Sequence, residues 1–180
     1  MENKFGFVSL SGRTNVGKST LLNAFFQKKI AITSRKPQTT RNRILGILTE
    51  EKSQIVFLDT PGVHLGYKRQ LNKVMNKIAS HCYEEVDIVL FLIDRFKWQK
   101  EEENILKSLK NLNKPVVLVI NKIDRLSDKT KLLAFIKDIS EKFNFLSIVP
   151  ISALKKDNLV ELKKVILNNL ETGPHHFPED

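Results

Sequence analysis

Eight residues near the N-terminus have the types and spacing needed to bind phosphate groups. Gly12 to Ser19 reads Gly-Arg-Thr-Asn-Val-Gly-Lys-Ser, which matches the pattern G-x-x-x-x-G-K-S of the P-loop. The glycines allow main-chain N–H groups to curl around phosphates, and a helix starting here would direct the positive end of its dipole at them. Lys18 would reach the β- and γ-phosphates of a nucleotide, and the Ser19 hydroxyl would bind Mg²⁺.

A second phosphate-directed motif, Asp-Thr-Pro-Gly, begins at Asp59, directly after an apolar stretch and about forty residues beyond the P-loop. Asp59 could hold Mg²⁺ through a water molecule, and Gly62 could donate its N–H to the terminal phosphate. The D-x-x-G tetrapeptide alone is weak evidence. At this distance after a P-loop, it predicts the metal side of a nucleotide site.

Residues 121–124 read Asn-Lys-Ile-Asp and follow the apolar run Val116–Ile120. The carboxylate of Asp124 could accept two parallel hydrogen bonds from the N1–H and 2-amino groups of guanine, whereas adenine has no such donor pair. Asn121 could bond to neighbouring loops and to the base edge, and the stem of Lys122 could cover the purine face. A polar turn is the alternative interpretation, and it does not explain the two phosphate motifs upstream.

The triplet Ser152, Ala153 and Leu154 follows the last apolar stretch, where its main-chain amides could meet the guanine carbonyl. The triplet has no meaning by itself, and its place after the other three motifs gives it weight. Asp124 argues against an ATP-dependent P-loop enzyme, and competition binding between nucleotides would decide that point.

The spacing of apolar residues predicts alternating strands and helices. Strands are expected at residues 5–10, 44–48, 54–58, 88–93, 116–120 and 147–151, and helices at 18–26, 68–82, 99–110, 128–142 and 158–170. This alternation requires a mostly parallel sheet with helices on both faces. We therefore expect a three-layer α/β P-loop fold, with a six-stranded sheet that contains one antiparallel strand in a hairpin. Asn158 and Glu161 are expected to cap the last helix.

Composition favours one folded domain, since the 180 residues are 41% hydrophobic and 28% charged. We expect the domain at residues 1–172 and the start of an interdomain linker at 173–180. Cys82 is the single cysteine and is expected to be structural. The chain shows no secretory signal and no apolar run of about 18 residues, which predicts a cytoplasmic location.

The net charge of +10 is unevenly placed along the sequence. Residues 1–49 hold nine Lys or Arg residues against one acid, Glu2. The excess of positive charge therefore lies in the segment that contains the P-loop, where phosphates would bind. The alternative is a set of solvated lysine-rich faces without a ligand.

Three segments resemble the bacterial Era GTPases, which belong to the TrmE-Era-EngA-EngB-Septin-like family. They are the P-loop and its helix at 12–23, the run Ile-Thr-Ser-Arg-Lys-Pro-Gln-Thr-Thr-Arg at 32–41, and His-His-Phe-Pro-Glu-Asp at 175–180. Thr14 departs from the proline usual in that family. The resemblance implies GTP and GDP as ligands, hydrolysis of GTP with Mg²⁺, and a role in 30S ribosomal subunit assembly and 16S rRNA maturation. It also implies an RNA-binding KH domain after residue 180, peripheral association with the inner membrane, and a monomer.

The resemblance also assigns roles to a threonine outside the four motifs and to an asparagine within the P-loop. Thr40, with Thr39 as second choice, would close over Mg²⁺ as the switch threonine, and Asn15 would bind K⁺ beside the β- and γ-phosphates. The alternative for Asn15 is a side-chain hydrogen bond that stabilises the loop. Val63 stands where Ras-like enzymes carry the glutamine that positions the attacking water, so turnover is expected to be slow.

These assignments together define the expected site. The expected GTP-binding residues are Gly12, Asn15, Val16, Gly17, Lys18, Ser19, Thr20, Asp59, Gly62, Asn121, Lys122, Asp124, Ser152, Ala153 and Leu154. The expected catalytic residues are Lys18, Thr40 and Gly62; the expected ligands are Ser19, Thr40 and Asp59 for Mg²⁺ and Asn15 for K⁺. The rival function is an RNA-binding assembly factor whose nucleotide hydrolysis is negligible.

Overall fold

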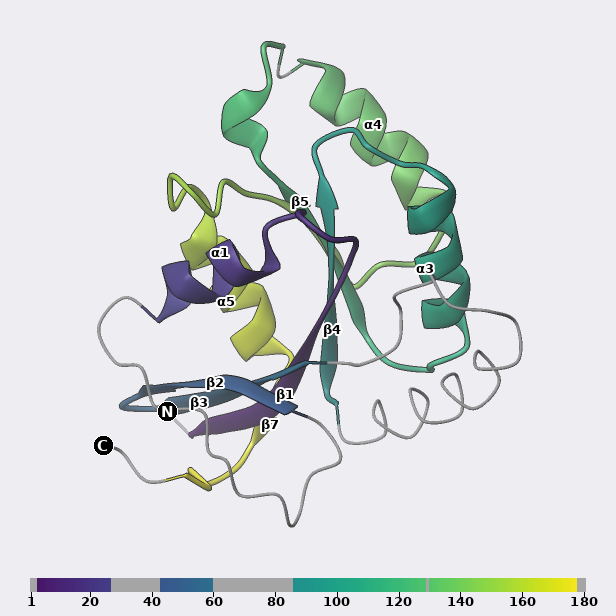
Figure 1. The fold of residues 1–180 in the computed structure, drawn as a ribbon. Helices are drawn as coiled ribbons and strands as arrows, with labels where there is room; N and C mark the ends of the chain where they lie inside the picture. Colours follow the sequence, from purple (N-terminus) through teal and green to yellow (C-terminus); the bar gives the residue numbers. More distant parts are fainter. Residues whose placement is uncertain (1–2, 27–42, 60–85, 129, 178–180) are drawn as a thin grey trace.

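The structure, a computed structural model, describes residues 3–26, 43–59, 86–128 and 130–177 (Figure 1). Its strands are β1 (Lys4–Ser11), β2 (Arg43–Glu50), β3 (Ser53–Asp59), β4 (Ile88–Asp94), β5 (Val116–Asn121), β6 (Ser147–Pro150) and β7 (Glu171–Thr172). Its helices are α1 (Lys18–Phe25), α3 (Lys100–Lys110), α4 (Thr130–Ser140) and α5 (Leu159–Asn168), with a 3-10 turn at Ile123–Arg125. The helix expected at 68–82 lies outside the described residues.

The strands form one sheet in the order β2-β3-β1-β4-β5-β6. Neighbouring pairs from β3 to β6 are parallel, and β2 runs antiparallel to β3 as the predicted hairpin. Figure 1 shows α1 and α5 on one face of the sheet and α3 and α4 on the other. The predicted three-layer α/β fold is confirmed.

The core has two parts because the central strands are buried on both faces. Every residue of β4 is buried, and alternate side chains contribute to opposite layers. Ile88, Leu90 and Leu92 join the cluster under α1 and α5, whereas Val89, Phe91 and Ile93 join the cluster under α3 and α4. This packing fixes the strand ends from which the candidate site residues project.

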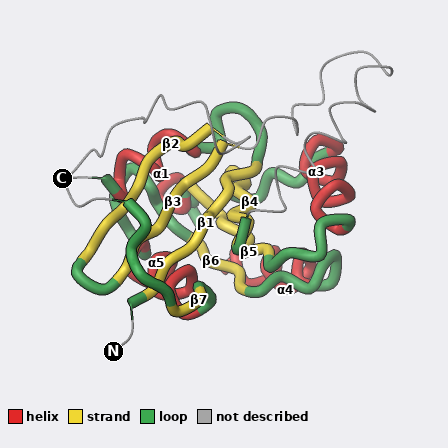
Figure 2. Tube along the Cα trace, turned by 90° about the horizontal axis from the view of Figure 1, so that it is seen from below, coloured by secondary structure: helices red, strands yellow, loops and turns green. Residues whose placement is uncertain are grey.

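The sheet differs from the expected six strands by the two-residue strand β7, which pairs antiparallel with Lys4 and Phe5 of β1 (Figure 2). The pairing between β1 and β4 begins only at Val8. The first part of β1 therefore has an edge that β4 leaves open, and β7 pairs with it. Two residues have no readable period, so the sequence pattern could not predict this strand.

Residues 173–177, expected as the start of a linker, are hydrogen-bonded to the sheet. The buried side chain of Gln54 on β3 accepts the main-chain N–H groups of His176 and Phe177, each at 2.9 Å. Its Nε2 donates to the Phe177 carbonyl at 2.9 Å and to Oγ1 of Thr49 at 3.0 Å. The described part of this segment thus lies along the domain surface; the boundary at residue 172 stays a prediction.

The predicted cap of the last helix is wrong. Asn158 has a left-handed backbone with φ 60°, makes no side-chain cap bond, and donates its Nδ2 to the Pro150 carbonyl at 2.8 Å. Its carboxamide thus bonds to a main-chain carbonyl at the end of β6 and not to an N–H group in the first turn of α5. A capping box occurs on α3, where Glu102 accepts the N–H of Gln99 at 2.9 Å. Among the residues described, no helix has the length and apolar character needed to cross a bilayer.

Candidate nucleotide-binding site

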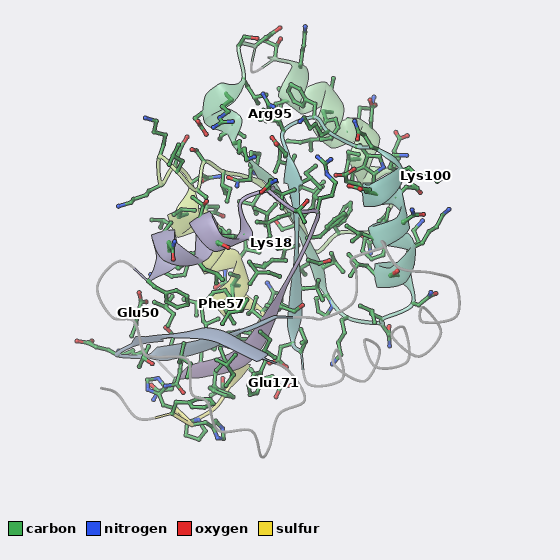
Figure 3. The ribbon with its side chains drawn as sticks, viewed as in Figure 1. Lys18, Glu50, Phe57, Arg95, Lys100 and Glu171 are labelled. Atoms are coloured by element: carbon green, nitrogen blue, oxygen red, sulfur yellow. The ribbon has the colours of Figure 1, made fainter. Side chains whose placement is uncertain are left out.

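The described residues of the four sequence motifs lie at one edge of the sheet. Since β1, β3, β4, β5 and β6 are parallel, their carboxyl ends lie at the same edge, and the P-loop, Asp59, residues 121–124 and residues 152–154 follow four of these ends. Open α/β sheets bind ligands at this edge. In Figure 3, Lys18 lies at the start of α1 and Arg95 lies just after β4, whereas Glu50 and Glu171 lie toward the other end of the sheet.

Both P-loop glycines occupy backbone conformations that favour glycine. Gly12 has φ 142° and Gly17 has φ 105°. A Cβ on Gly12 would overlap the Leu92 carbonyl oxygen, and a Cβ on Gly17 would overlap Nδ2 of Asn121. At these two glycines the backbone of the loop packs directly against β4 and against Asn121, and there is no room for a side chain between them.

Lys18 lies in the first turn of α1, where the P-loop pattern places it. Its Nζ donates to the carbonyls of Gly12 at 2.6 Å and Arg13 at 2.7 Å. The ammonium group is thus held within the loop that would surround the phosphates. Ser19 and Thr20, the next two residues, are exposed at the N-terminus of α1.

The backbone of Asp59 ends β3 beside the P-loop strand, since its Cα pairs with that of Leu10 on β1. An acid at this strand end and the Ser19 hydroxyl at the helix start are oxygen donors, the kind that Mg²⁺ prefers. The donor set therefore fits Mg²⁺. Thr40 and Gly62, which were expected to complete the phosphate side, lie outside the described residues.

Asn121 connects three loops, as its predicted bonding to neighbouring loops requires. Its buried side chain donates from Nδ2 to the Val16 carbonyl at 2.8 Å, and its Oδ1 accepts the Ala153 N–H at 3.0 Å. One carboxamide thus joins the P-loop to the triplet that follows β6.

Asp124 and Ser152 come together although 28 residues separate them. The buried Ser152 donates its hydroxyl to Oδ1 of Asp124 at 2.6 Å, while Asp124 itself is exposed. The serine fixes one carboxylate oxygen and leaves the group at the surface, where a base can reach it. Leu154, the third residue of the triplet, has 62% of its surface exposed.

Lys122 crosses from the base loop to the P-loop. Its Nζ donates to the Asn15 carbonyl at 2.6 Å and to Oδ2 of Asp94 at 3.0 Å. The side chain therefore extends between the two loops, consistent with the predicted cover over a purine. The backbone of Lys122 is left-handed, with φ 64°, which lets the chain turn sharply after β5.

Asp94, at the end of β4, is a site residue that the motif analysis missed. Burial by itself would raise the pKa of Asp94, but hydrogen bonds and charge attraction from Lys122 and Arg95 outweigh it, so the pKa is lowered overall. The carboxylate therefore stays ionised and holds Lys122 in place. An acid ending a parallel strand, as Asp59 ends β3, was the signal that could have identified it.

Comparison with known proteins agrees with this geometry. A sequence model of the family described as "50S ribosome-binding GTPase" matches residues 7–122, more than half of the chain. The chain belongs to this GTPase family. GTPase Era of Haemophilus influenzae (strain PittGG) is 51% identical over 175 residues, which make up 97% of this chain and 58% of that protein. The chain thus spans less than two thirds of the curated relatives it matches.

Two solved structures of this GTPase family superpose well on the fold. Era in complex with MgGDPNP and nucleotides 1506–1542 of 16S ribosomal RNA has a TM-score of 0.81 and 45% identity, and the match covers 99% of this chain and 61% of that one. An Aquifex aeolicus Era variant bound to GDP·AlF4⁻ has a TM-score of 0.80 and 46% identity, with 98% and 60% covered.

Proposed function

We propose that this chain is the GTP-binding part of a GTPase that binds GTP and GDP with Mg²⁺ and hydrolyses GTP to GDP and phosphate. The observation that carries the proposal is a set of three contacts. Asn121 and Lys122 join the 121–124 loop to the P-loop at Val16 and Asn15, and Ser152 joins the 152–154 loop to Asp124. The loop that carries the guanine selector is thus bonded to the phosphate loop, which supports a single binding site.

For guanine, Asp124 would accept the N1–H and 2-amino protons, with its carboxylate already oriented by Ser152. The stem of Lys122 would cover the purine face while its ammonium group stays on the Asn15 carbonyl and Asp94. Adenine would leave the Asp124 carboxylate facing no donor pair. The site should therefore prefer GTP and GDP over ATP and ADP.

For the phosphates, the P-loop N–H groups and Lys18 would bind the β- and γ-phosphoryl oxygens. When bound, Mg²⁺ would neutralise phosphate charge, held by Ser19, by Thr40 and by Asp59 through water. The oxygen of a water molecule would bond to the γ-phosphorus in line with the bridging bond, which breaks and leaves its electron pair on GDP. The protons of the water would leave with the phosphate product and exchange with solvent. Lys18 would stabilise the charge that develops on the bridging oxygen, and Gly62 would donate its N–H to the γ-phosphate.

A potassium ion is a further part of the proposal. Asn15 is an exposed residue of the P-loop, and its main-chain carbonyl accepts a hydrogen bond from Lys122. Its side-chain oxygen would bind K⁺ near the β- and γ-phosphates and supply positive charge where Val63 offers no glutamine. The alternative role, a loop-stabilising hydrogen bond, predicts equal turnover in K⁺ and Na⁺.

The relatives support a proposal for the biological role. Era in the solved complex holds a GTP analogue and a segment of 16S ribosomal RNA. We propose that this protein acts as a switch in 30S subunit assembly and 16S rRNA maturation, as a cytoplasmic monomer with peripheral contact to the inner membrane.

The deciding experiment is phosphate release from GTP with and without purified small ribosomal subunits. The proposed function predicts slow turnover alone and faster turnover with subunits, with no turnover of ATP in either case. The second candidate, an RNA-binding assembly factor with negligible hydrolysis, is favoured by Val63 at the position of the glutamine. It predicts tight binding of GTP and subunits with no phosphate released under either condition.

A further inference from the structure

A buried ion pair joins the P-loop to α3. Nε of Arg13 lies 2.5 Å from Oε1 of Glu102, as a charge contact without the alignment of a hydrogen bond. The side chain of Glu102 is 1% exposed and that of Arg13 is 19% exposed. A carboxylate so fully removed from water requires a cation nearby, because leaving it unpaired is costly. Arg13 supplies that cation.

The carboxylate of Glu102 is fixed independently of Arg13. Its Oε2 accepts the N–H of Gln99 at 2.9 Å, and this places the group at the start of α3. The helix is anchored in turn by the buried side chains of Ile105, Leu106 and Leu109. Glu102 is therefore a rigid attachment point, and the ion pair fastens the P-loop to a packed helix.

Arg13 also touches the phosphate-binding lysine through its main chain. The Arg13 carbonyl accepts Nζ of Lys18 at 2.7 Å, beside the Gly12 carbonyl at 2.6 Å. Any displacement of the Arg13 peptide therefore moves an acceptor of Lys18. A continuous path of contacts runs from the core of α3 through Glu102 and Arg13 to the ammonium group.

We propose that Arg13 and Glu102 are a positioning pair for GTP hydrolysis, which holds the P-loop peptide that orients Lys18. This inference rests on the proposed hydrolysis. The guanidinium group is bound to α3, so Arg13 acts through the position of Lys18 and does not contact the γ-phosphate. The contribution should be larger in the transition state than in GDP binding, because only the former needs Lys18 to face the charge developing on the bridging oxygen.

The central test compares Glu102→Gln with the wild-type protein in steady-state GTP hydrolysis. Glutamine keeps the size of the side chain and can still accept the Gln99 N–H, so the start of α3 is preserved. We expect kcat to fall about tenfold, while KM and GDP affinity change less than about threefold. Glu101→Gln is the matched control, because Glu101 is exposed and 3.8 Å from Nε of Arg13, and its kcat should stay within about twofold.

Arg13 variants complete the test. Arg13→Gln should match the loss in Glu102→Gln, Arg13→Lys should restore part of the rate, and the double variant Arg13→Gln/Glu102→Gln should be no slower than either single one. Thermal unfolding and GDP binding show that each variant is folded, and a folded variant with wild-type kcat would reduce the pair to a structural contact.

Two other outcomes would also overturn the proposal. Faster hydrolysis in Glu102→Gln would mean that the carboxylate restrains an arginine that acts directly on the phosphates. If the wild-type protein shows no turnover, alone or with small ribosomal subunits, both the proposed function and the positioning role of the pair are wrong. If the wild-type protein turns over GTP and the variants do so at the same rate, the positioning role of the pair is wrong and the proposed function stands.

Discussion

Asp124, Asn121 and Lys122 are each held by a side-chain contact to another loop, whereas the P-loop holds Lys18 through two main-chain carbonyls. The base half of the site thus consists of side chains that are held in place by neighbouring loops. The phosphate half consists of backbone shaped by glycines, with few side chains that reach the ligand. Substitutions in the base half should therefore change which nucleotide binds, and those in the phosphate half should change whether it reacts.

The largest expected effect lies in the phosphate half. Lys18→Ala should lower GTP turnover by about 10³-fold, because no other described side chain donates to the same carbonyls or could replace its charge at the bridging oxygen. Ser19→Ala should abolish the Mg²⁺-dependent turnover, because the metal would lose a ligand. Phosphate release measures both effects, and Lys100→Ala on α3 is the matched control for charge removal. Normal hydrolysis by either site variant would contradict the P-loop assignment.

In the base half, Asp124→Asn should weaken GDP binding by about 100-fold and strengthen binding of the xanthine nucleotide, whose 2-oxo group accepts where guanine donates. Titration calorimetry with both nucleotides measures the two affinities. Asp128→Asn nearby in the chain is the control, since Asp128 bonds to Thr130 and is outside the predicted site. Equal GDP affinity in wild-type and Asp124→Asn proteins would place the base elsewhere.

Asn15 belongs to both halves, because its carbonyl is held by Lys122 while its side chain is proposed to bind K⁺. GTP turnover should be about tenfold faster in K⁺ than in Na⁺ at equal ionic strength, since K⁺ would place positive charge beside the phosphates. Asn15→Ala should abolish the difference and leave GDP affinity nearly unchanged. Equal wild-type rates in the two salts would leave a bound partner as the source of catalytic help.

The smallest effect is expected at Asp94, whose carboxylate accepts a hydrogen bond from Lys122 in the base half. Asp94→Asn should weaken GDP binding about threefold to tenfold, because Lys122 loses a charged acceptor but keeps the Asn15 carbonyl. The pKa of Asp94 is lowered, so its contribution is complete above its ordinary pKa of 3.8 and disappears as the pH falls through the lowered value. The affinity ratio between wild-type and variant should therefore stay constant from about pH 8 to about pH 5. A ratio that changes within that range would argue against the charge contact.

The sequence predicted the strands and helices well where the pattern was long and apolar. The run at 116–120 and the strand at 88–93 fall within β5 and β4, and the hairpin of β2 and β3 pairs as expected. The motifs also predicted which residues reach the carboxyl edge of the sheet, because a parallel sheet leaves few other arrangements. The order of strands and helices along the sequence was therefore enough to predict most of the fold.

The contacts between distant residues were not predictable from local pattern. Gln54 is a polar residue in an apolar strand, and only the folded chain shows that it accepts His176 and Phe177, more than 120 residues away. Glu102 resembles its neighbours Glu101, which is exposed, and Glu103, which is half-buried, yet it alone of the three is fully buried. Asn158 was predicted as a cap from spacing, but its carboxamide bonds instead to Pro150 of β6. Each difference arises from tertiary packing, which a periodic pattern does not contain.

Trp98 lies in the connection that runs from Asp94 to Glu102, and it is the single tryptophan of the sequence. Its indole N–H donates to Glu103 at 2.9 Å, its ring contacts Phe91 edge-on at 5.9 Å, and Nζ of Lys142 lies 5.9 Å from the ring centre. Indole fluorescence from these 180 residues therefore comes from one place, between β4 and α3. A change in emission on adding nucleotide would report movement of that connection directly, without an attached dye.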